Sequence, residues 1–434
     1  DPTKNFAVLG NYDHTLKSST IRFDSVALTT TYFDKPIKGI LTERAFKFNR
    51  EEDKIYPQFL SFEKRLMINE IVPGVDYIGG FALKGASFLG AGTDSERAMI
   101  TIKKDNVPFI TAKAKEIVVS SEKVAVFKGE MALFFKTGDS LTHPGIGLDF
   151  NIVKKQIQFV RAKSGIGEAP FQDSYHKLDV YVPKIIWNLD EDELHYTYEF
   201  GTSQEQRLAR FESQSYFDAR LYDQLQSMEA THPLVALSKF CYKYDEYNLT
   251  EGQAATALNK IVDQAKPLLL QLSSLGFISY DSELKTVVVK PKLDNFVRAK
   301  VGKRDYDNIV FRSDLRPRKL TGSLVTLAES DPSFKAEFDQ RNRALTLKKD
   351  FAVLSLSTLE LDLDAVDNVL ISANKNTIIF PADGLVKVKE NRDFVYTGWT
   401  NAGKLETNAE SASFSYNDFK IKLQKTNESL FRVR

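Results

Sequence analysis

The sequence contains one cysteine, Cys241, among 434 residues, which excludes an internal disulfide and any multi-cysteine metal site. An excess of charge of either sign is also missing, because 59 Lys and Arg residues almost cancel 58 Asp and Glu residues and leave a net charge of +1. No global field therefore draws the chain to DNA or to an anionic membrane. Any charged partner has to be recognised by a local patch.

Long apolar runs are absent as well. The three leucines at 268–270 are among the longest purely aliphatic stretches, whereas a membrane-spanning helix needs roughly 18 apolar residues. We therefore expect no membrane-spanning helix. The length of the chain predicts two or three domains, each with its own hydrophobic core.

Composition leaves the cellular compartment open. A lack of disulfides is expected of a cytoplasmic protein and is also common in bacterial envelope proteins. The chain begins at Asp1, without methionine and without the basic, apolar and small-residue zones of a secretory signal. We expect a mature or excised segment of a longer polypeptide.

Residues that could carry catalysis are few and dispersed. None of the five histidines lies in an HExxH or comparable ligand spacing. One polar segment contains Asp139 and His143, and a second contains Asp173, Ser174 and His176. If the fold joined the two segments, these side chains could form a nucleophile and a base. Neither segment has a nucleophile elbow or an oxyanion loop, so we favour structural turns.

Two acidic runs, residues 188–193 and 362–367, raise the question of a calcium site, because calcium takes several converging oxygen ligands. The first run lacks the glycine of an EF-hand loop, and the second places Asp362 and Asp364 on one face of a strand. We interpret both as solvated faces and turns. The sequence predicts no metal and no cofactor.

Period-two alternation of apolar and polar residues dominates residues 1–200 and returns after residue 350, which predicts half-buried strands. Around Phe23 and Val26 the phase of the alternation slips by one residue, which predicts a bulge. Further strands are predicted at 98–103, 110–119, 124–135, 178–182 and 195–200, with a charged hairpin tip at Lys154 and Lys155. Strand after strand without intervening helices favours antiparallel sheets, a sandwich or a β-solenoid.

A helix-rich island interrupts the strands between residues 213 and 301. Helices are predicted at 216–228, 233–244 and 261–275, and Thr250 with Gln253 fits a capping box before a short helix that ends at Leu258. Gly276 supplies the left-handed stop of the last helix. Strands at 277–280 and 286–289 follow as a tight hairpin. From His232 to Lys292, three helices and then a tight hairpin follow the order of a winged helix.

A winged helix binds nucleic acid in many proteins and braces other domains in others. The predicted third helix exposes Asp263, Gln264, Lys266, Gln271 and Ser273, which is a thin supply of groups for base edges and phosphates. The best basic cluster lies downstream and consists of Arg312, Arg316, Arg318 and Lys319. Because aspartates interleave with these cations, we favour a packing or docking role over direct nucleic-acid binding.

Several segments resemble parts of large β-rich proteins from Bacteroidota that are associated with the cell envelope or exported. These segments are residues 139–145, 169–176, 211–218 and 391–398. The resemblance spans most of the chain from about Asp76 onward. It implies an exported or cell-envelope location and a parent protein longer than this chain, and it implies no catalytic or binding residues.

Together these patterns predict a mainly β protein with antiparallel sheets, in a sandwich or β-solenoid-like arrangement, and an inserted winged-helix-like α-rich module. We expect a β-rich region over 1–205, the helical insert over 206–310 and a C-terminal β-rich region over 311–434. The predicted function is a non-enzymatic scaffold or protein-interaction segment with a protein partner. The alternatives are a nucleic-acid-binding module, acting through the winged helix and the Arg312–Lys319 cluster, and a carbohydrate-active β-solenoid enzyme.

Overall fold

The computed structural model describes residues 5–10, 12–15, 17–44, 56–85, 87–93, 95–199, 207–226, 231–317, 319–321 and 323–431. Strands account for 49% and helices for 20% of the structure, so the predicted mainly β class with antiparallel sheets is confirmed. The chain forms two compact units, Asp1–Gly138 with Thr142–Phe159, and Asp139–Leu141 with Val160–Arg434. The predicted boundaries near residues 205 and 310 both fall inside the second unit. No helix among the described residues is long and apolar enough to cross a membrane.

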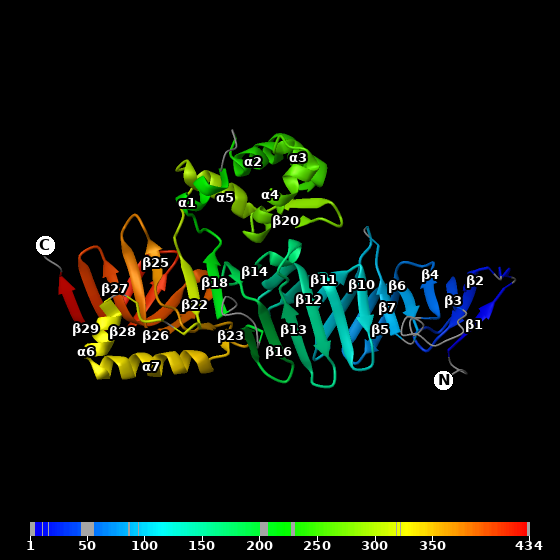
Figure 1. Cartoon of the computed structure of the whole chain (residues 1–434), viewed down its shortest axis with the longest axis horizontal. Helices are drawn as coiled ribbons and strands as arrows, with labels where there is room; N and C mark the ends of the chain where they lie inside the picture. Colours follow the sequence, from blue (N-terminus) through cyan, green and yellow to red (C-terminus); the bar gives the residue numbers. More distant parts are fainter. Residues whose placement is uncertain are drawn as a thin grey trace. The chain divides into compact units, whose positions relative to one another are not determined.

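The first unit is built from antiparallel strands joined mostly by short turns (Figure 1). Its strands are β1 (Phe6–Leu9), β2 (Thr20–Thr29), β3 (Ile37–Arg44), β4 (Gln58–Ser61), β5 (Leu66–Val72), β6 (Val75–Lys84), β7 (Ser87–Ala91), β8 (Ala98–Lys104), β9 (Val107–Ala114), β10 (Glu116–Val119), β11 (Lys123–Phe134), β12 (Ser140–Asn151) and β13 (Gln156–Val160). The register between β2 and β3 shifts between Phe23 and Val26, so the predicted bulge is confirmed.

Strand β6 serves two successive pairs of neighbours. Its first half pairs with β5 and β8 and its second half with β4 and β7, and the change falls at Gly79 and Gly80. The fully buried Tyr77 donates a hydrogen bond to the Gly80 carbonyl at 2.5 Å. A Cβ atom at Gly79 or Gly90 would overlap the Tyr77 ring. The glycines therefore leave the space in which this aromatic side chain packs.

The second unit is also built from antiparallel strands. Its strands outside the helical part are β14 (Phe171–Asp173), β15 (Leu178–Tyr181), β16 (Lys184–Asn188), β17 (Glu193–Thr197), β18 (Leu208–Ser213), β22 (Val310–Asp314), β23 (Asp350–Ser355), β24 (Leu361–Leu363), β25 (Val369–Ser372), β26 (Thr377–Val388), β27 (Phe394–Ala402), β28 (Leu405–Ser415) and β29 (Lys420–Phe431). One ladder runs β14–β15–β18–β22, and another runs β16–β17–β23–β24–β26–β27–β28–β29. Turns η2 (Gly165–Glu168) and η4 (Glu390–Arg392) are 3₁₀ helices.

A helical module, defined as residues 219–300, is inserted between the paired strands β18 and β22. It contains α1 (Ala219–Gln226), α2 (Pro233–Tyr244), β19 (Asn248–Thr250), α3 (Glu251–Ala257), α4 (Val262–Ser274), β20 (Ile278–Asp281), β21 (Thr286–Val289) and α5 (Pro291–Lys300). The bounds of α2 and the capping box of Thr250 and Gln253 are those predicted. Its own buried core includes Leu237, Leu269 and Phe296. The module is therefore a small helical domain with both ends at one point of the sheet.

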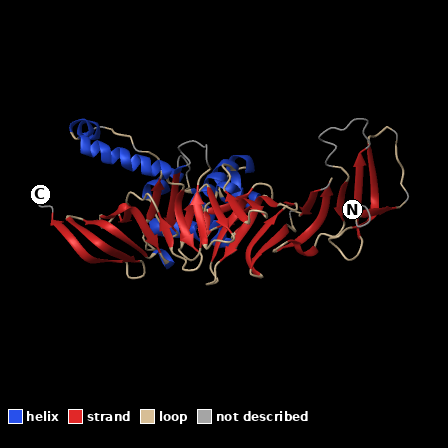
Figure 2. Cartoon of the chain, turned by 90° about the horizontal axis from the view of Figure 1, so that it is seen from below, coloured by secondary structure: helices blue, strands red, loops and turns tan. Residues whose placement is uncertain are grey.

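Two further helices, α6 (Ser323–Ser330) and α7 (Pro332–Leu347), precede β23, and they were not predicted. Figure 1 draws them apart from the helical module, and α7 is the long helix on the side of the C-terminus in Figure 2. Asp331 caps α7 through the amides of Ser333 and Phe334, and Pro332 begins the helix. An Asp-Pro pair is a start signal that the sequence displays. Only Leu345 of α7 is buried, so the helix lacks the apolar stripe by which the others were found.

Candidate functional site

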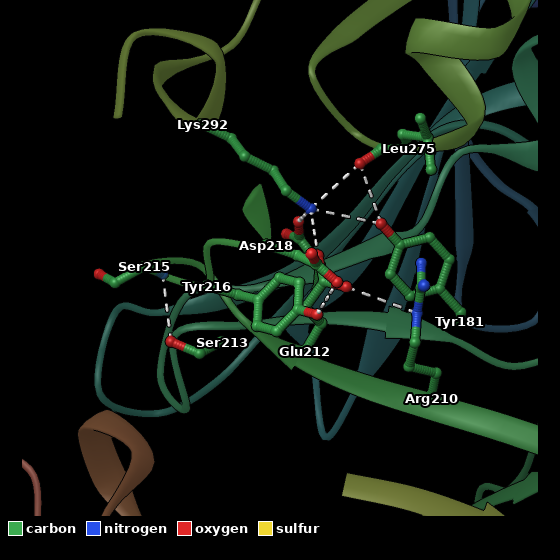
Figure 3. A network of polar contacts seen from close by, with 10 residues as sticks. Tyr181, Arg210, Glu212, Ser213, Ser215, Tyr216, Asp218, Leu275 and Lys292 are labelled. Carbon is green, nitrogen blue, oxygen red and sulfur yellow. Dashed lines mark hydrogen bonds and ion pairs between the residues drawn. The ribbon is translucent and has the colours of Figure 1, made fainter. Parts of the chain in front are cut away.

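The most concentrated group of buried charges in the described chain lies where the helical module meets the sheet (Figure 3). Lys292, the second residue of α5, donates from Nζ to Asp179 Oδ2 at 2.8 Å, Glu212 Oε1 at 2.5 Å and the Leu275 carbonyl at 3.0 Å. We call these four residues, with Tyr181 and Arg210, the base network. The side chains of Lys292, Asp179 and Glu212 are 7%, 2% and 5% exposed.

Aromatic and guanidinium groups complete the base network. The Tyr181 hydroxyl donates to the Leu275 carbonyl at 3.0 Å, and the Arg210 guanidinium lies 3.9 Å from the centre of the Tyr181 ring. Arg210 Nε is also 3.6 Å from Glu212 Oε2. Burial raises the pKa of Tyr181 to about 12, so its hydroxyl stays protonated and able to donate. Every strong acceptor in the network thus faces a donor.

The protonation state of Lys292 follows from its neighbours. Burial by itself lowers the pKa of an ammonium group, but the carboxylates of Asp179 and Glu212 outweigh burial and raise the pKa of Lys292 well above its usual value. Lys292 is therefore a fixed cation. A lysine in the first turn of a helix opposes the helix dipole, which indicates that its place is set by tertiary contacts.

A second cluster lies at the neck of the module, which we define as the place where β18 ends and β22 begins. Buried Asp307 accepts hydrogen bonds from Ser213 Oγ at 2.6 Å and from the Tyr416 hydroxyl at 2.8 Å. Arg392 stacks 3.5 Å from the centre of the Tyr416 ring and donates to Ser213 Oγ and to Ser215 Oγ. Burial raises the pKa of Asp307 above its usual range despite these bonds. This neck cluster ties both connections of the module to the turn before β27.

The structure brings two of the four predicted site residues together. His176 Nδ1 lies 2.7 Å from Asp173 Oδ2, and His176 Nε2 lies 2.9 Å from the Leu359 carbonyl. The His176 ring is fully buried. Burial lowers the pKa of His176, but Asp173 and the Leu359 carbonyl outweigh it and raise that pKa above its usual value. An imidazolium that donates from both nitrogens joins the β14–β15 turn to the segment before β24.

The other two predicted residues make different contacts. Asp139 accepts a hydrogen bond from Ser174 Oγ at 2.9 Å, so the predicted nucleophile faces this carboxylate, whereas His176 faces Asp173 and Leu359. His143 is buried in the part of β12 that belongs to the first unit, and its Nδ1 accepts from the Gly145 amide at 3.0 Å. The described contacts of Asp139 and His143 therefore hold a turn and a strand in place.

The predicted basic cluster is partly neutralised. Arg316 donates to both carboxylate oxygens of Asp314, at 2.7 and 2.6 Å. Arg312 is exposed on β22, Lys319 lies in the segment before α6, and Arg318 lies outside the described residues. The Asp314 carboxylate thus reduces the positive potential that phosphate binding by this cluster would require.

A groove of about 470 Å³ opens between α2, the end of α3 and α4 of the helical module. Its apolar part is formed by Pro233, Ala236, Phe240, Ala257, Leu258 and Leu268. Three lysines, Lys239, Lys243 and Lys260, also line it, and the described lining residues include no Asp or Glu. We call this surface the α2–α4 groove. In Figure 1, α2 and α3 lie on the side of the module farthest from β18.

A scan of protein-family models, a search of curated proteins and a search of solved structures each found no match to the chain. Within the described residues, no group of three or more His, Cys, Asp or Glu side chains is placed to hold a metal ion. The base network was not predicted from the sequence. Lys292 is 113 positions from Asp179 and 80 from Glu212, so no local motif joins them.

Proposed function

We propose that the chain is a non-enzymatic scaffold segment that presents its helical module to a protein partner. The observation that carries this proposal is the base network, in which Lys292 is held by two buried carboxylates and a carbonyl at the foot of the module. A buried ion pair specifies one arrangement because separating its members leaves uncompensated charges. The foot of the module is fixed to the sheet, whereas α2 and α3, which help to line the α2–α4 groove, lie on the side of the module farthest from β18 (Figure 1).

We further propose that the module is a winged helix used for protein docking. The order of α2, β19, α3, α4, β20 and β21, with a sheet ordered β19–β21–β20, supports this interpretation. Use on nucleic acid has less support, because α4 carries an exposed Asp263–Lys266 ion pair at 3.1 Å, and the Arg316 guanidinium is held by Asp314. A phosphate backbone needs unneutralised cations along its path.

An exported or cell-envelope location is part of the same proposal. Its support is the resemblance of residues 139–145, 169–176, 211–218 and 391–398 to envelope-associated proteins of Bacteroidota. A rigid module on a large sheet suits a protein that holds partners in place outside the cytoplasm. Fractionation of cells that express the protein would test this location directly.

Site-specific photocrosslinking in cells that encode the protein tests the docking role. A photoreactive residue replaces Tyr242, which is 86% exposed on α2, and the control replaces Val153, which is 74% exposed on the β12–β13 turn. We expect one adduct of defined mass from position 242 and none from position 153. Absence of an adduct at 242, together with a monodisperse monomer in solution, contradicts the proposal, as does turnover of a polysaccharide by the purified chain.

A further inference from the structure

Helix α2 has two adjacent apolar stripes: one is fully buried in the module's own core, and the other is only partly buried against that core. Leu234, Leu237 and Cys241 are fully buried against the other helices. Pro233, Ala236 and Phe240 follow the same helical spacing one position earlier and line the α2–α4 groove. A helix with apolar residues around so much of its surface is usually covered on both stripes. The groove is therefore a surface whose apolar stripe is suited to a covering partner.

The charged side chains among the described lining residues of the groove are all lysines. Lys239 and Lys243 extend from α2, and Lys260 follows α3 across the opening. The Lys243 ammonium lies 4.9 Å from the centre of the Tyr244 ring, so it stays close to the groove. The whole chain carries a net charge of only +1, so a lining with three cations and no described anion is a local concentration. Such a rim steers and aligns a negatively charged partner.

We propose that the α2–α4 groove binds an acidic amphipathic segment of a partner protein, with large apolar side chains in the groove and carboxylates facing Lys239 and Lys243 of α2. This inference rests on the proposed docking role of the helical module. An amphipathic helix that lays its apolar face into a groove is an established mode of peptide recognition. The apolar stripe of α2 favours a peptide over a nucleic acid, whose backbone offers no aliphatic anchor.

Fluorescence anisotropy on the full chain tests the inference with synthetic probes. The first peptide places Leu or Phe at positions i, i+3, i+4 and i+7 and Glu elsewhere. The second has Lys in place of every Glu, and the third keeps the Glu residues but has Ala in place of every Leu and Phe. A labelled DNA duplex and vesicles of anionic phospholipid complete the set. We expect only the first peptide to bind, with a dissociation constant of about 1–100 μM, as is usual for a small transient interface.

Variants locate the binding. Lys239→Glu and Lys243→Glu together should weaken the binding of the first peptide by roughly tenfold or more, the size expected from losing two exposed ion pairs and adding repulsion. Ala236→Trp, which fills the groove without changing its charge, should weaken it similarly. The matched control has Lys404→Glu and Lys420→Glu, two exposed lysines in the β27–β28 turn and at the start of β29, and should bind normally. Circular dichroism verifies folding, and a double Lys→Gln variant replaces any charge reversal that fails to fold.

Several results would overturn the inference. Equal binding of the acidic peptide with and without its apolar residues excludes groove recognition, and tighter binding of the duplex or the vesicles assigns the lysines to another class of partner. Unchanged affinity in the groove variants places the peptide elsewhere. An adduct at position 242 that forms in cells despite failed peptide binding leaves the docking role intact and refutes only the acidic partner.

Discussion

The substitution Lys292→Met tests the base network most directly, because methionine keeps most of the side-chain volume and removes the ammonium group. The variant leaves Asp179 and Glu212 buried without their cation. Breaking a buried ion pair by removing one partner destabilises a protein by about 3–5 kcal/mol. The loss should be local to the foot of the helical module, since Lys292 joins α5 to β15, β18 and the end of α4.

Hydrogen exchange measured by mass spectrometry resolves such a local effect in a chain with two compact units, for which a single unfolding midpoint is ill defined. Amides of α4, β20 and α5 should exchange about 10² to 4 × 10³ times faster in Lys292→Met, because 1.4 kcal/mol corresponds to a factor of ten. Strands β26 to β29 should be unaffected. The additional changes Asp179→Asn and Glu212→Gln should recover more than half of the loss, since they remove the uncompensated charges.

Lys300→Met is the matched control in the same helix. Lys300 pairs with Asp223 at 2.6 Å, but these side chains are 35% and 64% exposed. An exposed pair contributes about 0.2–1 kcal/mol, so exchange should accelerate by less than about fivefold. Equal acceleration of hydrogen exchange in Lys292→Met and Lys300→Met would refute the conclusion that the base network holds the helical module on the sheet.

Three further predictions concern single contacts. His176→Gln should flatten the pH dependence of thermal unfolding of the second unit above about pH 6.5. Burial lowers the pKa of His176, but Asp173 raises it by more, so the stabilisation by His176 is full below the unfolded pKa of about 6.5 and is lost as pH rises through the folded pKa. Parallel profiles of variant and parent would contradict this. Thr250→Ala should lower the free energy of hydrogen exchange of the first-turn amides of α3 by about 1 kcal/mol, because it removes the capping hydrogen bond. Thr256→Ala, which removes no capping hydrogen bond, should leave the exchange of those amides unchanged. Gly276→Ala should destabilise β20 by more than about 1 kcal/mol, because Gly276 has φ +78° and its Cβ would lie 3.1 Å from Pro170 Cγ; exchange of β20 as slow as in the parent would exclude this strain.

Local chemistry explains which parts of the fold were predictable. The bounds of α2, the capping box at Thr250, the left-handed stop at Gly276 and the bulge at Phe23 all depend on neighbours within a few positions. Helix α7 was missed because its polar surface carries no apolar stripe, although the pair Asp331 and Pro332 announces its start. Periodicity detects helices that pack, and α7 packs little.

The candidate site, in contrast, depends on contacts between residues that are distant in sequence. His176 and Asp173 were noted as a pair of reactive residue types, and their spacing of three placed them in contact across one turn. Whether a histidine is a base or a buried cation depends on what surrounds it, and here Leu359, from a segment 183 positions away, occupies its second nitrogen. The residues of the base network could not be recognised in the sequence, because lysine, aspartate and glutamate are common surface residues.

The sequence by itself determined the strand-rich class, the position of the helical module and the signals that begin and end its helices, because hydrophobic period and capping act over a few residues. Only the tertiary structure decided that Lys292 would be enclosed by Asp179 and Glu212, and that one apolar stripe of α2 would be only partly covered in a groove that three lysines line. Burial is the physical reason. The same ammonium group is a solvated charge on a surface and a structural lock when chain segments distant in sequence exclude water from it.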